Sequence, residues 1–358
     1  MYLDNLKLNN FKNFTEFEHN FTQINCIVGN NGVGKTNILD AIFYLSFCKG
    51  FNSANDLTTT KYGADFFAIH GAYTLQDGTK ETYTCSQKKD QKKIIKHGKT
   101  AYKKFSEHIG KVPCVMVSPS DQIYILGHSE IRRKFLDMLL SQVDVVYLEN
   151  LINYNRSLEQ RNKLLKYQQQ TGFFDSLQME IWNEKLSDYA TVIQEKRREF
   201  FLAFQEPFKH FYNFISSNSE TPQVEYKTYE GNLLDLLQNS YEKEKVIGHT
   251  TVGIHKDDLV FFLDGHNVHH SGSQGQQKTF MLAMKLAQYD YIKKKKGVTP
   301  ILLLDDIFDK FDFNRVQKIL SLVTQEDFGQ VFLTDTHLSR VEDIIPQSKK
   351  DITTIIKL

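Results

Sequence analysis

The sequence predicts an α/β nucleotide-binding fold that carries an antiparallel β layer and an inserted helical segment. The stretch GNNGVGKTN, Gly29 to Asn37, fits a phosphate-cradling loop and lies between an apolar strand pattern and a helical pattern. Short alternating runs broken by Gly and Asp fill residues 64–117. Long segments with few helix breakers follow from about 129 to 215, and a mixed α/β pattern returns from about 240.

The elements around the phosphate loop are a strand at residues 1–11, a short apolar strand at 21–29 and a helix at 35–47. In the β-rich part, FFAIHGAYTL, ETYTCSQ, KKIIKHG and VPCVMVS predict four short strands. We expect them to form an antiparallel sheet layered on the nucleotide-binding part.

The middle of the chain predicts an antiparallel helical hairpin. Leu151, Leu158 and Leu165 recur every seven residues, and a second long helix is expected over 173–204. Its apolar face comprises Leu177, Ile181, Leu186, Tyr189, Ile193 and Phe200. The sequence QQQTGFF supplies the turn between the two helices. A plain two-helix core element explains the same pattern and remains the alternative.

Toward the C-terminus, residues 276–294 predict a helix, 298–306 a buried strand, and the apolar stretches 329–337 and 351–358 two more strands. The chain therefore leaves its nucleotide fold and returns to it. The predicted parts are a nucleotide-binding part at 1–125, an inserted helical lobe at 126–240 and a second nucleotide-binding part at 241–358.

The phosphate loop predicts its own chemistry. Its glycines let backbone N–H groups curl round an anion, Lys35 reaches the β- and γ-phosphates, and Thr36 offers a hydroxyl to Mg²⁺. The N-terminus of the following helix adds a favourable partial charge. The residues predicted to bind the nucleotide are Asn30, Asn31, Gly32, Val33, Gly34, Lys35, Thr36 and Asn37.

A buried strand ends in two acids, Asp305 and Asp306. Asp305 is placed to order a water on Mg²⁺, so Thr36 and Asp305 are the predicted metal residues, and Asp306 is placed to polarise the attacking water. Two surface acids at a strand end give the same sequence, but the phosphate loop upstream favours the catalytic interpretation. Asp306 and Lys35 are thus predicted to be catalytic. His337, about 30 residues later, is either a third catalytic residue that senses the γ-phosphate or a surface histidine.

Ser273-Gln274-Gly275-Gln276, directly before a predicted helix, separates the classes of nucleotide enzyme. By itself it is a capped helix start with Ser273 as N-cap. Its position between the phosphate loop and the double acid resembles the signature motif of ABC-type ATPases. This resemblance implies ATP as the nucleotide and a signature that contacts the γ-phosphate bound by a second subunit. Kinases and small GTPases do not need this element.

Seven stretches, in order over nearly the whole chain, resemble the RecF family of SMC-like ATPases. They are LKLNNFKNF, GNNGVGKTNILDAIFYL, SPSDQIYILGHSEIRRKFLDMLL, YNRSLEQRNKLLK, GIHKDDL, GSQGQQKT and LLLDDIFDKFD. Asn52 departs from the family because a basic side chain is missing there, and Lys256 because it lacks the bidentate fork of arginine. DKFD, residues 309–312, occupies the place of the ABC D-loop. Gln122 stands where the family has an apolar residue, so no role is assigned to it.

The resemblance implies an ABC-ATPase head with an inserted helical lobe, which closes as an ATP-dependent homodimer around two ATP molecules. It implies binding of double-stranded DNA and of double-strand/single-strand junctions, cooperation with RecR and RecO, and help in loading RecA during recombinational repair and replication restart. It also implies weak, DNA-stimulated hydrolysis that resets the dimer. The alternative is another SMC-like ABC ATPase, acting as a nucleotide-dependent scaffold without a RecA link.

Two sets of cations are candidates for a DNA surface. The stretch KKDQKKIIKHGKTAYKK is lysine-rich and can track phosphates; it begins with Lys88, Lys89, Lys92 and Lys93. The second set, from the helical lobe, is Arg132, Arg133, Arg197 and Arg198. A hairpin kept soluble by lysines and ordinary helix-surface charge are the alternatives.

Composition narrows the remaining classes. The formal net charge of +1 does not indicate a globally basic nucleic-acid binder, which leaves only local patches. The four cysteines form no CxxC pair, which argues against a zinc site and is consistent with a reducing cytoplasm. The sequence predicts no secretory signal, and no apolar run approaches the roughly 20 residues of a membrane span. We therefore expect a cytoplasmic protein with no membrane partner.

Overall fold

The computed structural model describes residues 1–51, 58–216, 220–307, 313–325, 327–338, 340 and 347–358. The chain forms two compact units. Unit 1 comprises Met1–Gln122, His210–Ser219 and Gln274–Leu358, and unit 2 comprises Ile123–Lys209 and Glu220–Ser273. The sequence predicts lobe boundaries near residues 125 and 240, and this division stays a prediction. In the structure, residues 241–273 belong to unit 2.

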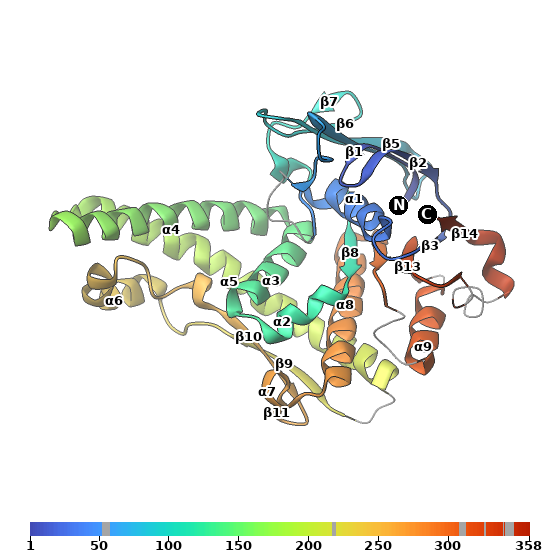
Figure 1. Cartoon of the computed structure of the whole chain (residues 1–358). Helices are drawn as coiled ribbons and strands as arrows, with labels where there is room; N and C mark the ends of the chain where they lie inside the picture. The colour runs from blue at the N-terminus through green and yellow to red at the C-terminus, as the bar shows by residue number, and fades with distance from the viewer. Residues whose placement is uncertain (52–57, 217–219, 308–312, 326, 339, 341–346) are drawn as a thin grey trace. The chain divides into compact units, whose positions relative to one another are not determined.

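A five-stranded parallel sheet forms the centre of unit 1, with the strand order β14-β3-β13-β12-β8 (Figure 1). The strands are β3 (Ile24–Val28), β8 (Cys114–Val117), β12 (Ile301–Leu304), β13 (Val331–Asp335) and β14 (Thr353–Lys357). All residues of β3, β8, β12 and β13 are buried, as expected for a parallel sheet with both faces covered. Helix α1 (Lys35–Phe47) contacts β8 and β13, and helix α8 (Gln274–Lys296) contacts β8.

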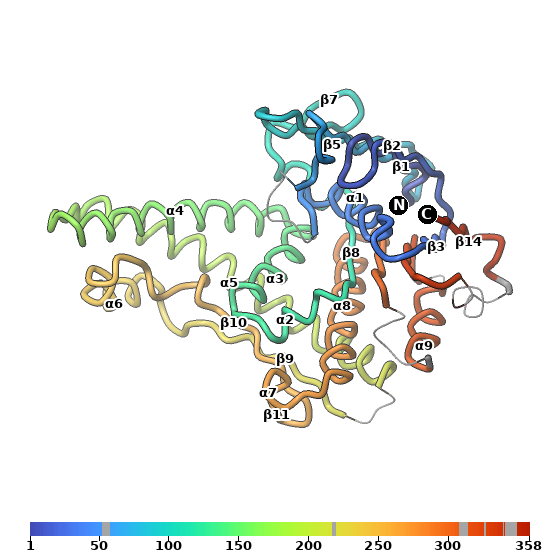
Figure 2. The backbone as a smooth tube through the Cα atoms, in the orientation of Figure 1, coloured from blue at the N-terminus to red at the C-terminus, as the bar shows by residue number. Residues whose placement is uncertain are grey.

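The sheet brings distant parts of the chain together. Strand β3 leads into the phosphate loop and lies between β13 and β14. Figure 2 shows β3 and β14 close together although they come from opposite ends of the chain. Ile24 of β3 pairs with both Val331 and Thr353. The strand that positions the phosphate loop is therefore supported on both sides by residues from the last part of the chain.

The predicted antiparallel layer is confirmed as a six-stranded sheet with the order β2-β1-β4-β5-β6-β7. Its strands are β1 (Tyr2–Phe11), β2 (Phe14–Asn20), β4 (Phe66–Thr74), β5 (Lys80–Lys88), β6 (Ile94–His97) and β7 (Thr100–Ala101). One predicted member is wrong: VPCVMVS forms β8 of the parallel sheet. Its fully buried residues pair in parallel with Ile301–Leu304, a partner that an antiparallel surface layer does not offer.

Unit 2 confirms the helical hairpin and adds a small sheet that the sequence did not predict. Its helices are α2 (Ile123–Leu126), α3 (Ser129–Val143), α4 (Val145–Thr171), α6 (Leu233–Ile247), α7 (Val268–Ser271) and the part of α5 (Ser176–Ser216) up to residue 209. The sheet has the order β11-β10-β9, from β9 (Pro222–Lys227), β10 (Asp258–Leu263) and β11 (His266–Asn267).

The remaining described elements are one helix and four short 3₁₀ segments. Unit 1 contains helix α9 (Phe313–Val323) and the 3₁₀ segments Phe105–Glu107, Pro119–Gln122 and Gln347–Ile352. Unit 2 contains the 3₁₀ segment Ile254–Lys256.

Local signals set the ends of the hairpin. The carboxylate of Asp144 caps α4 by accepting a hydrogen bond from the backbone N–H of Tyr147 at 3.0 Å. Gly172 ends α4 with a φ of 76°, the left-handed conformation that favours glycine. Tyr147 contacts Arg197, whereas Arg161 later in α4 contacts Asn183 earlier in α5, so the two helices run antiparallel.

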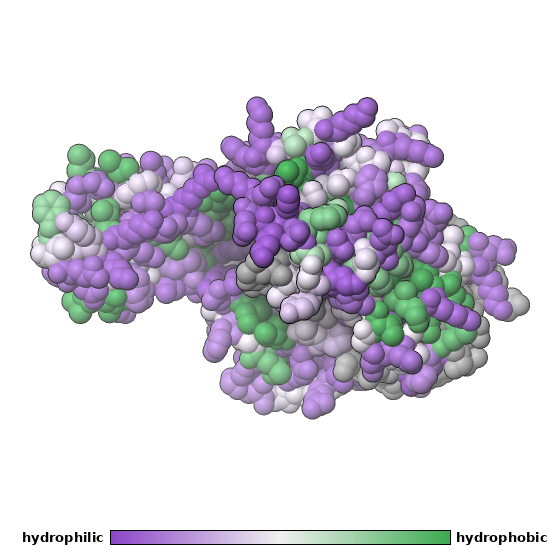
Figure 3. All heavy atoms as spheres, turned by 45° about the horizontal axis from the view of Figure 1, so that its top comes forward, coloured by the Kyte–Doolittle hydropathy of each residue, from purple (hydrophilic) through white to green (hydrophobic). Residues whose placement is uncertain are grey.

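The interior of the hairpin differs from the predicted leucine seam. The buried side chains of α4 are Tyr147, Tyr154, Ser157, Arg161 and Leu165, while Leu151 and Leu158 are only half-buried. Leu177 and Ile181, expected on the inner face of α5, are exposed. Hydrophobic side chains accordingly show at the left-hand end of the α4–α5 hairpin in Figure 3.

Among the described helices, none is long and apolar enough to cross a membrane.

Candidate functional site

The phosphate loop, Gly29–Gly34, joins β3 to α1 and is braced by Asn13. Gly34 has a φ of 116°, and a Cβ added there would lie 2.6 Å from Nδ2 of Asn13. Asn13 donates from Nδ2 to the carbonyl of Val33 at 2.7 Å, and its Oδ1 accepts from Asn37 at 2.7 Å. Only glycine fits at this position, and the loop keeps a shape in which its backbone can approach an anion closely.

Lys35 is the first residue of α1, and its ammonium group lies back over the loop. Nζ donates to the carbonyl oxygens of Gly29 at 2.7 Å and Asn30 at 3.1 Å, and the side chain is buried. A fixed positive charge therefore lies at the loop, beside the N-terminus of a 13-residue helix. The cation, the backbone N–H groups and the helix dipole all favour a phosphate at this place.

Thr36 and Asp305 contact each other directly. The hydroxyl of Thr36 lies 2.9 Å from Oδ1 and 3.1 Å from Oδ2 of Asp305, and the hydroxyl of Thr334 donates to Oδ1 at 2.9 Å. Burial raises the pKa of Asp305 to about 6, opposed by these two hydrogen bonds and reinforced by the neighbouring charge of Asp306. The carboxylate is thus a buried acid whose charged form gains from a nearby cation.

These groups fit Mg²⁺. A hydroxyl and a carboxylate are oxygen ligands, which Mg²⁺ prefers, and this ion is commonly held by one or two protein groups together with phosphates and water. No group of three or more metal-binding side chains occurs among the residues that the structure describes.

Asp306 follows with a left-handed backbone conformation. Its φ is 46°, a value that is uncommon outside glycine but that Asp and Asn adopt more often than other residues, as Asp90 and Asp264 do elsewhere in the chain. The backbone N–H of Asp306 donates to the hydroxyl of Thr334 at 2.9 Å, and that hydroxyl lies 3.4 Å from Oδ1 of Asp306. Thr334 therefore orients both acids, a role that its position at a strand end did not reveal.

The two remaining predicted elements are placed but not joined to the acids by a described contact. His337 is exposed, and its backbone N–H donates to Asp335 at 2.5 Å. Ser273 and Gln274 are exposed, and α8 begins at Gln274. Their predicted roles stay predictions, and the D-loop-like residues 309–312 lie outside the described residues, as does Asn52.

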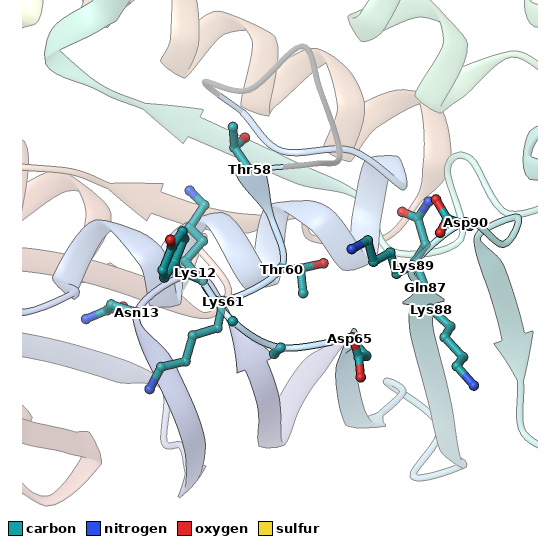
Figure 4. A pocket seen from close by; sticks show the side chains of 13 residues that line it. Lys12, Asn13, Thr58, Thr60, Lys61, Asp65, Gln87, Lys88, Lys89 and Asp90 are labelled. Atoms are coloured by element: carbon teal, nitrogen blue, oxygen red, sulfur yellow. The ribbon is translucent and has the colours of Figure 1, made fainter.

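A cavity of about 1100 Å³ lies on the antiparallel sheet, and one of its lining residues is Asn13, which braces the phosphate loop. Figure 4 shows Lys12 and Lys61 near Asn13 on one side, and Lys88 and Lys89 on the other. The sequence did not predict this cavity, because its walls come from three separate stretches of the chain. Its size suffices for a small-molecule ligand.

Gln122, to which the sequence assigned no role, lies close to the acids. It lines a smaller cavity of about 210 Å³ together with Asp305, Gln274 and Lys278. Its Nε2 donates to Oε1 of Gln277 at 2.8 Å. The residue that precedes the α-helical insertion is therefore part of the surroundings of Asp305.

The lysine-rich stretch is mostly exposed. Lys88, Lys89 and Lys92 are exposed, and Figure 3 shows hydrophilic side chains over strands β5–β7. Lys93 is the exception: its Nζ donates to the hydroxyl of Tyr44 at 2.7 Å and to the carbonyl of Cys48 at 2.6 Å. Lys93 is therefore not part of the predicted DNA surface, because its ammonium group donates hydrogen bonds within unit 1.

Three of the four predicted arginines of the helical lobe are bound by protein acceptors, whereas Arg198 is exposed. Arg132 forms a bidentate pair with Asp258, at 2.7 and 2.9 Å, and Arg133 donates to the carbonyl of Asp257 at 2.7 Å. Arg197 is only 1% exposed and pairs with Asp257 at 2.6 Å. The prediction that these three arginines are surface cations is wrong. They stabilise unit 2, because their guanidinium groups donate to protein acceptors.

The stretch GIHKDDL, one of the seven that resemble the RecF family, also supports unit 2. Besides the two acids, the half-buried His255 lies between Tyr154 of α4 and Thr250. The ring Nε2 lies 3.2 Å from the carbonyl of Thr250, which only accepts, so the ring Nδ1 accepts from the hydroxyl of Tyr154 at 2.7 Å. His255 is therefore held in its neutral form.

This arrangement predicts a stability that depends on pH. Burial lowers the pKa of His255 to about 4, whereas an unfolded histidine titrates near 6.5. As the pH falls from 6.5 toward 4, the unfolded chain takes up the proton first, so the free energy of unfolding should decrease, by about 2 kcal/mol at pH 5. Urea unfolding at pH 7.5 and 5 should show this loss in the wild type and in the exposed-histidine control His249→Gln. An equal loss in His255→Gln would contradict the assignment.

The chain is similar to known proteins over nearly its whole length. The family model described as RecF/RecN/SMC N terminal domain matches residues 2–350. A protein of Flavobacterium johnsoniae called DNA replication and repair protein RecF is 46% identical over 348 residues, which are 96% of this chain and 97% of the relative. A protein of the same name from Phocaeicola vulgatus is 42% identical over 355 residues, 98% of this chain and 95% of the relative.

Solved structures agree with these relatives. A structure described as the recombination mediator protein RecF-ATP in the RecFOR pathway has a TM-score of 0.88 and 30% identity, and covers 94% of this chain and 92% of that chain. An Smc head domain from Pyrococcus furiosus has a TM-score of 0.58 at 16% identity, covering 96% of this chain and 92% of that chain. The latter likeness concerns the fold alone.

Proposed function

Since this chain belongs to the RecF/RecN/SMC family, we propose that it is an ATP-binding recombination mediator of DNA replication and repair. RecF-named relatives match it over nearly their full length, which favours this function over that of a scaffold ATPase without a RecA link. The observation that carries the proposal is the cluster of Thr36, Asp305, Thr334 and Asp306 beside the phosphate loop. These side chains are joined by hydrogen bonds of 2.9–3.4 Å.

The geometry supports a division of roles among these residues. The loop residues Asn30–Asn37 hold the phosphates of ATP, and Lys35 neutralises them. Thr36 and Asp305 hold Mg²⁺, which when bound supplies positive charge to the phosphates. Asp306, half-exposed and fixed by Thr334, receives a proton from the attacking water or orients that water. His337 senses the γ-phosphate from the end of β13.

We infer that ATP joins two copies of the chain. Ser273–Gln276 of one copy contact the γ-phosphate held by the phosphate loop of the other. The closed dimer holds duplex DNA beside a single-stranded gap and acts with RecR and RecO to load RecA. Hydrolysis is slow, is stimulated by DNA and reopens the dimer. In thermodynamic terms, ATP, DNA and the second copy each favour the same closed state.

The molar mass in solution tests this proposal. Light scattering of the wild type should shift from monomer to dimer when ATP and Mg²⁺ are added, and a gapped duplex should lower the protein concentration needed for the shift. ADP is the matched control and should leave the protein monomeric. A mass that stays monomeric with ATP, with and without the gapped duplex, would exclude the ATP-joined dimer.

The exposed lysines of unit 1 predict a salt-dependent DNA affinity. Each lysine that neutralises a phosphate contributes about 0.9 to the slope of log K against log salt, so Lys88→Ala, Lys89→Ala and Lys92→Ala together should reduce the slope by about 2–3. Fluorescence anisotropy with a gapped duplex at 50–200 mM salt measures it. The matched control combines Lys163→Ala, Lys166→Ala and Lys243→Ala, exposed lysines of unit 2. Equal slopes in the two triple variants would show that the lysine-rich hairpin serves solubility.

A further inference from the structure

Helix α7 is a single turn that carries two adjacent exposed histidines, His269 and His270. It follows β11 in unit 2 (Figure 1). Nδ1 of His269 lies 3.3 Å from Nδ1 of His270, and the ring centres are 4.6 Å apart with the planes at 77°. Neighbouring side chains on a helix normally point away from each other, by about 100°. The approach of these two nitrogens is therefore a particular feature of this turn.

The backbone under the two histidines is well supported. The side chain of Asn267 accepts from the backbone N–H of His269 at 2.9 Å, and the hydroxyl of Ser271 donates to the carbonyl of Asn267 at 2.8 Å. Val268 is completely buried, and α7 contacts α2, β10 and β11. Only the torsions of the two imidazole side chains remain to be ordered when a ligand binds, which keeps the entropic cost of binding small.

The contact between the two rings is one that a cation can occupy. In the hydrogen bond, one Nδ1 carries a proton and the other accepts it, so the proton lies between the two nitrogens. A metal ion can take the place of this proton if the donating ring moves its proton from Nδ1 to Nε2. Both rings then stay neutral, and each presents a lone pair on Nδ1, the form in which histidine binds metals.

The distance between the nitrogens indicates a tetrahedral ion. Zn²⁺ binds histidine nitrogens at about 2.0–2.1 Å, so two such ligands at the tetrahedral angle lie roughly 3.3–3.4 Å apart. Two nitrogens at a right angle, as in square-planar or octahedral sites, would lie only about 2.9 Å apart. The observed 3.3 Å agrees with the tetrahedral arrangement. Mg²⁺ prefers oxygen ligands and is not expected at this pair.

We propose that His269 and His270 form a Zn²⁺ site through their two Nδ1 atoms. No third metal-binding side chain joins them within the described part of the chain, so two of the four coordination positions stay open to water or to a donor from another molecule. The ion therefore binds reversibly and with modest affinity. The pair shares no residue with the proposed ATP site, so either proposal can fail without the other.

Titration calorimetry with ZnCl₂ tests the site, using the untagged full chain with Mg²⁺ in excess to compete for the carboxylates. We expect a single Zn²⁺ site, and His269→Gln and His270→Gln should each weaken it by at least about tenfold. His249→Gln is the matched control, because His249 is an exposed histidine of unit 2 whose ring lies 3.2 Å from a backbone carbonyl, that of Ile247. This control should bind Zn²⁺ as the wild type does. The four cysteines are buried and should not contribute.

Two spectroscopic measurements identify the ligands. Co²⁺ in place of Zn²⁺ should give the intense visible absorption of a tetrahedral site. Long-range ¹H–¹⁵N NMR spectra should show Zn²⁺ on Nδ1 and the proton on Nε2 of both rings. His269→Gln and His270→Gln should lose both signals while their unfolding temperature stays within about 2 °C of wild type, because the two side chains are exposed.

Zn²⁺ affinity that is unchanged in either variant, or that falls equally in His249→Gln, would overturn the proposal. Coordination through Nε2, or the weak absorption of octahedral Co²⁺, would overturn it as well, because the two Nδ1 atoms would then not act as a pair. So would a wild type that binds no Zn²⁺ below about 100 μM. The ATP-dependent dimer is decided by light scattering without Zn²⁺, so its presence or absence leaves these outcomes unaffected.

Discussion

Replacing Asp306 by asparagine is expected to lower kcat for ATP hydrolysis by about 100-fold or more, because the amide cannot take a proton from the attacking water. The two side chains have nearly the same shape, and the backbone N–H of residue 306 keeps its bond to Thr334. Binding of ATP and Mg²⁺, which depends on Lys35, Thr36 and Asp305, should therefore persist. The variant should accumulate as an ATP-bound dimer, visible by light scattering as a mass that does not return to monomer.

The matched control is Asp264→Asn. Asp264 also has a left-handed backbone, with a φ of 48°, and it lies in unit 2, where its carboxylate accepts from the N–H of Thr221 at 2.8 Å. Steady-state phosphate release should match wild type in this control. Turnover of Asp306→Asn within about threefold of wild type would show that Asp306 does not act on the attacking water.

Replacing Ser273 by arginine should abolish the ATP-dependent dimer at micromolar protein while leaving ATP binding by the monomer within about twofold of wild type. Ser273 is exposed and stands directly before the first residue of α8. In the proposed dimer its small hydroxyl faces a phosphate of the other subunit, and a long side chain would keep the two surfaces apart. Light scattering gives the mass, and a fluorescent ATP analogue gives the monomer affinity.

Ser271→Arg is the control for this substitution. Ser271 is an exposed serine two positions earlier, whose hydroxyl donates to the carbonyl of Asn267 at 2.8 Å. It should dimerise as the wild type does. If Ser273→Arg dimerises normally as well, SQGQ is only a helix start, and the dimer must use another surface.

The phosphate loop and the two acids could be predicted from the sequence because each is a short local pattern. A glycine loop, a lysine and a strand ending in Asp305-Asp306 identify themselves within a few residues, and the parallel sheet brings them together. The role of Thr334 could not be predicted in this way. A threonine at a strand end has no distinctive neighbours in the sequence, and only the pairing of β12 with β13 places it between two acids.

The errors have a common physical cause. Arg132 and Arg197 stand in helical segments among charged neighbours, so they look like surface cations. Their acids, Asp257 and Asp258, lie more than 50 residues away in the sequence, and no local pattern records the pairing. The sequence predicts the strand Cys114–Val117 in the wrong sheet for the same reason, because its partner Ile301–Leu304 is distant in the sequence. Contacts at long sequence separation decide burial, and the sequence read in short windows does not contain them.

The position of β3 between β13 and β14 has a consequence for how the protein is made. Val28, which leads into the phosphate loop, pairs with Asp335 and Lys357, so more than 300 residues separate it from these partners. At about 5–20 residues per second, a ribosome needs roughly 15–60 s to supply them. During that time the nascent chain carries an apolar strand without its neighbours, and the nucleotide loop has no rigid support. Nucleotide binding should therefore begin only late in synthesis, and a fusion placed just beyond β14 would act on the phosphate loop more directly than its distance in the sequence suggests.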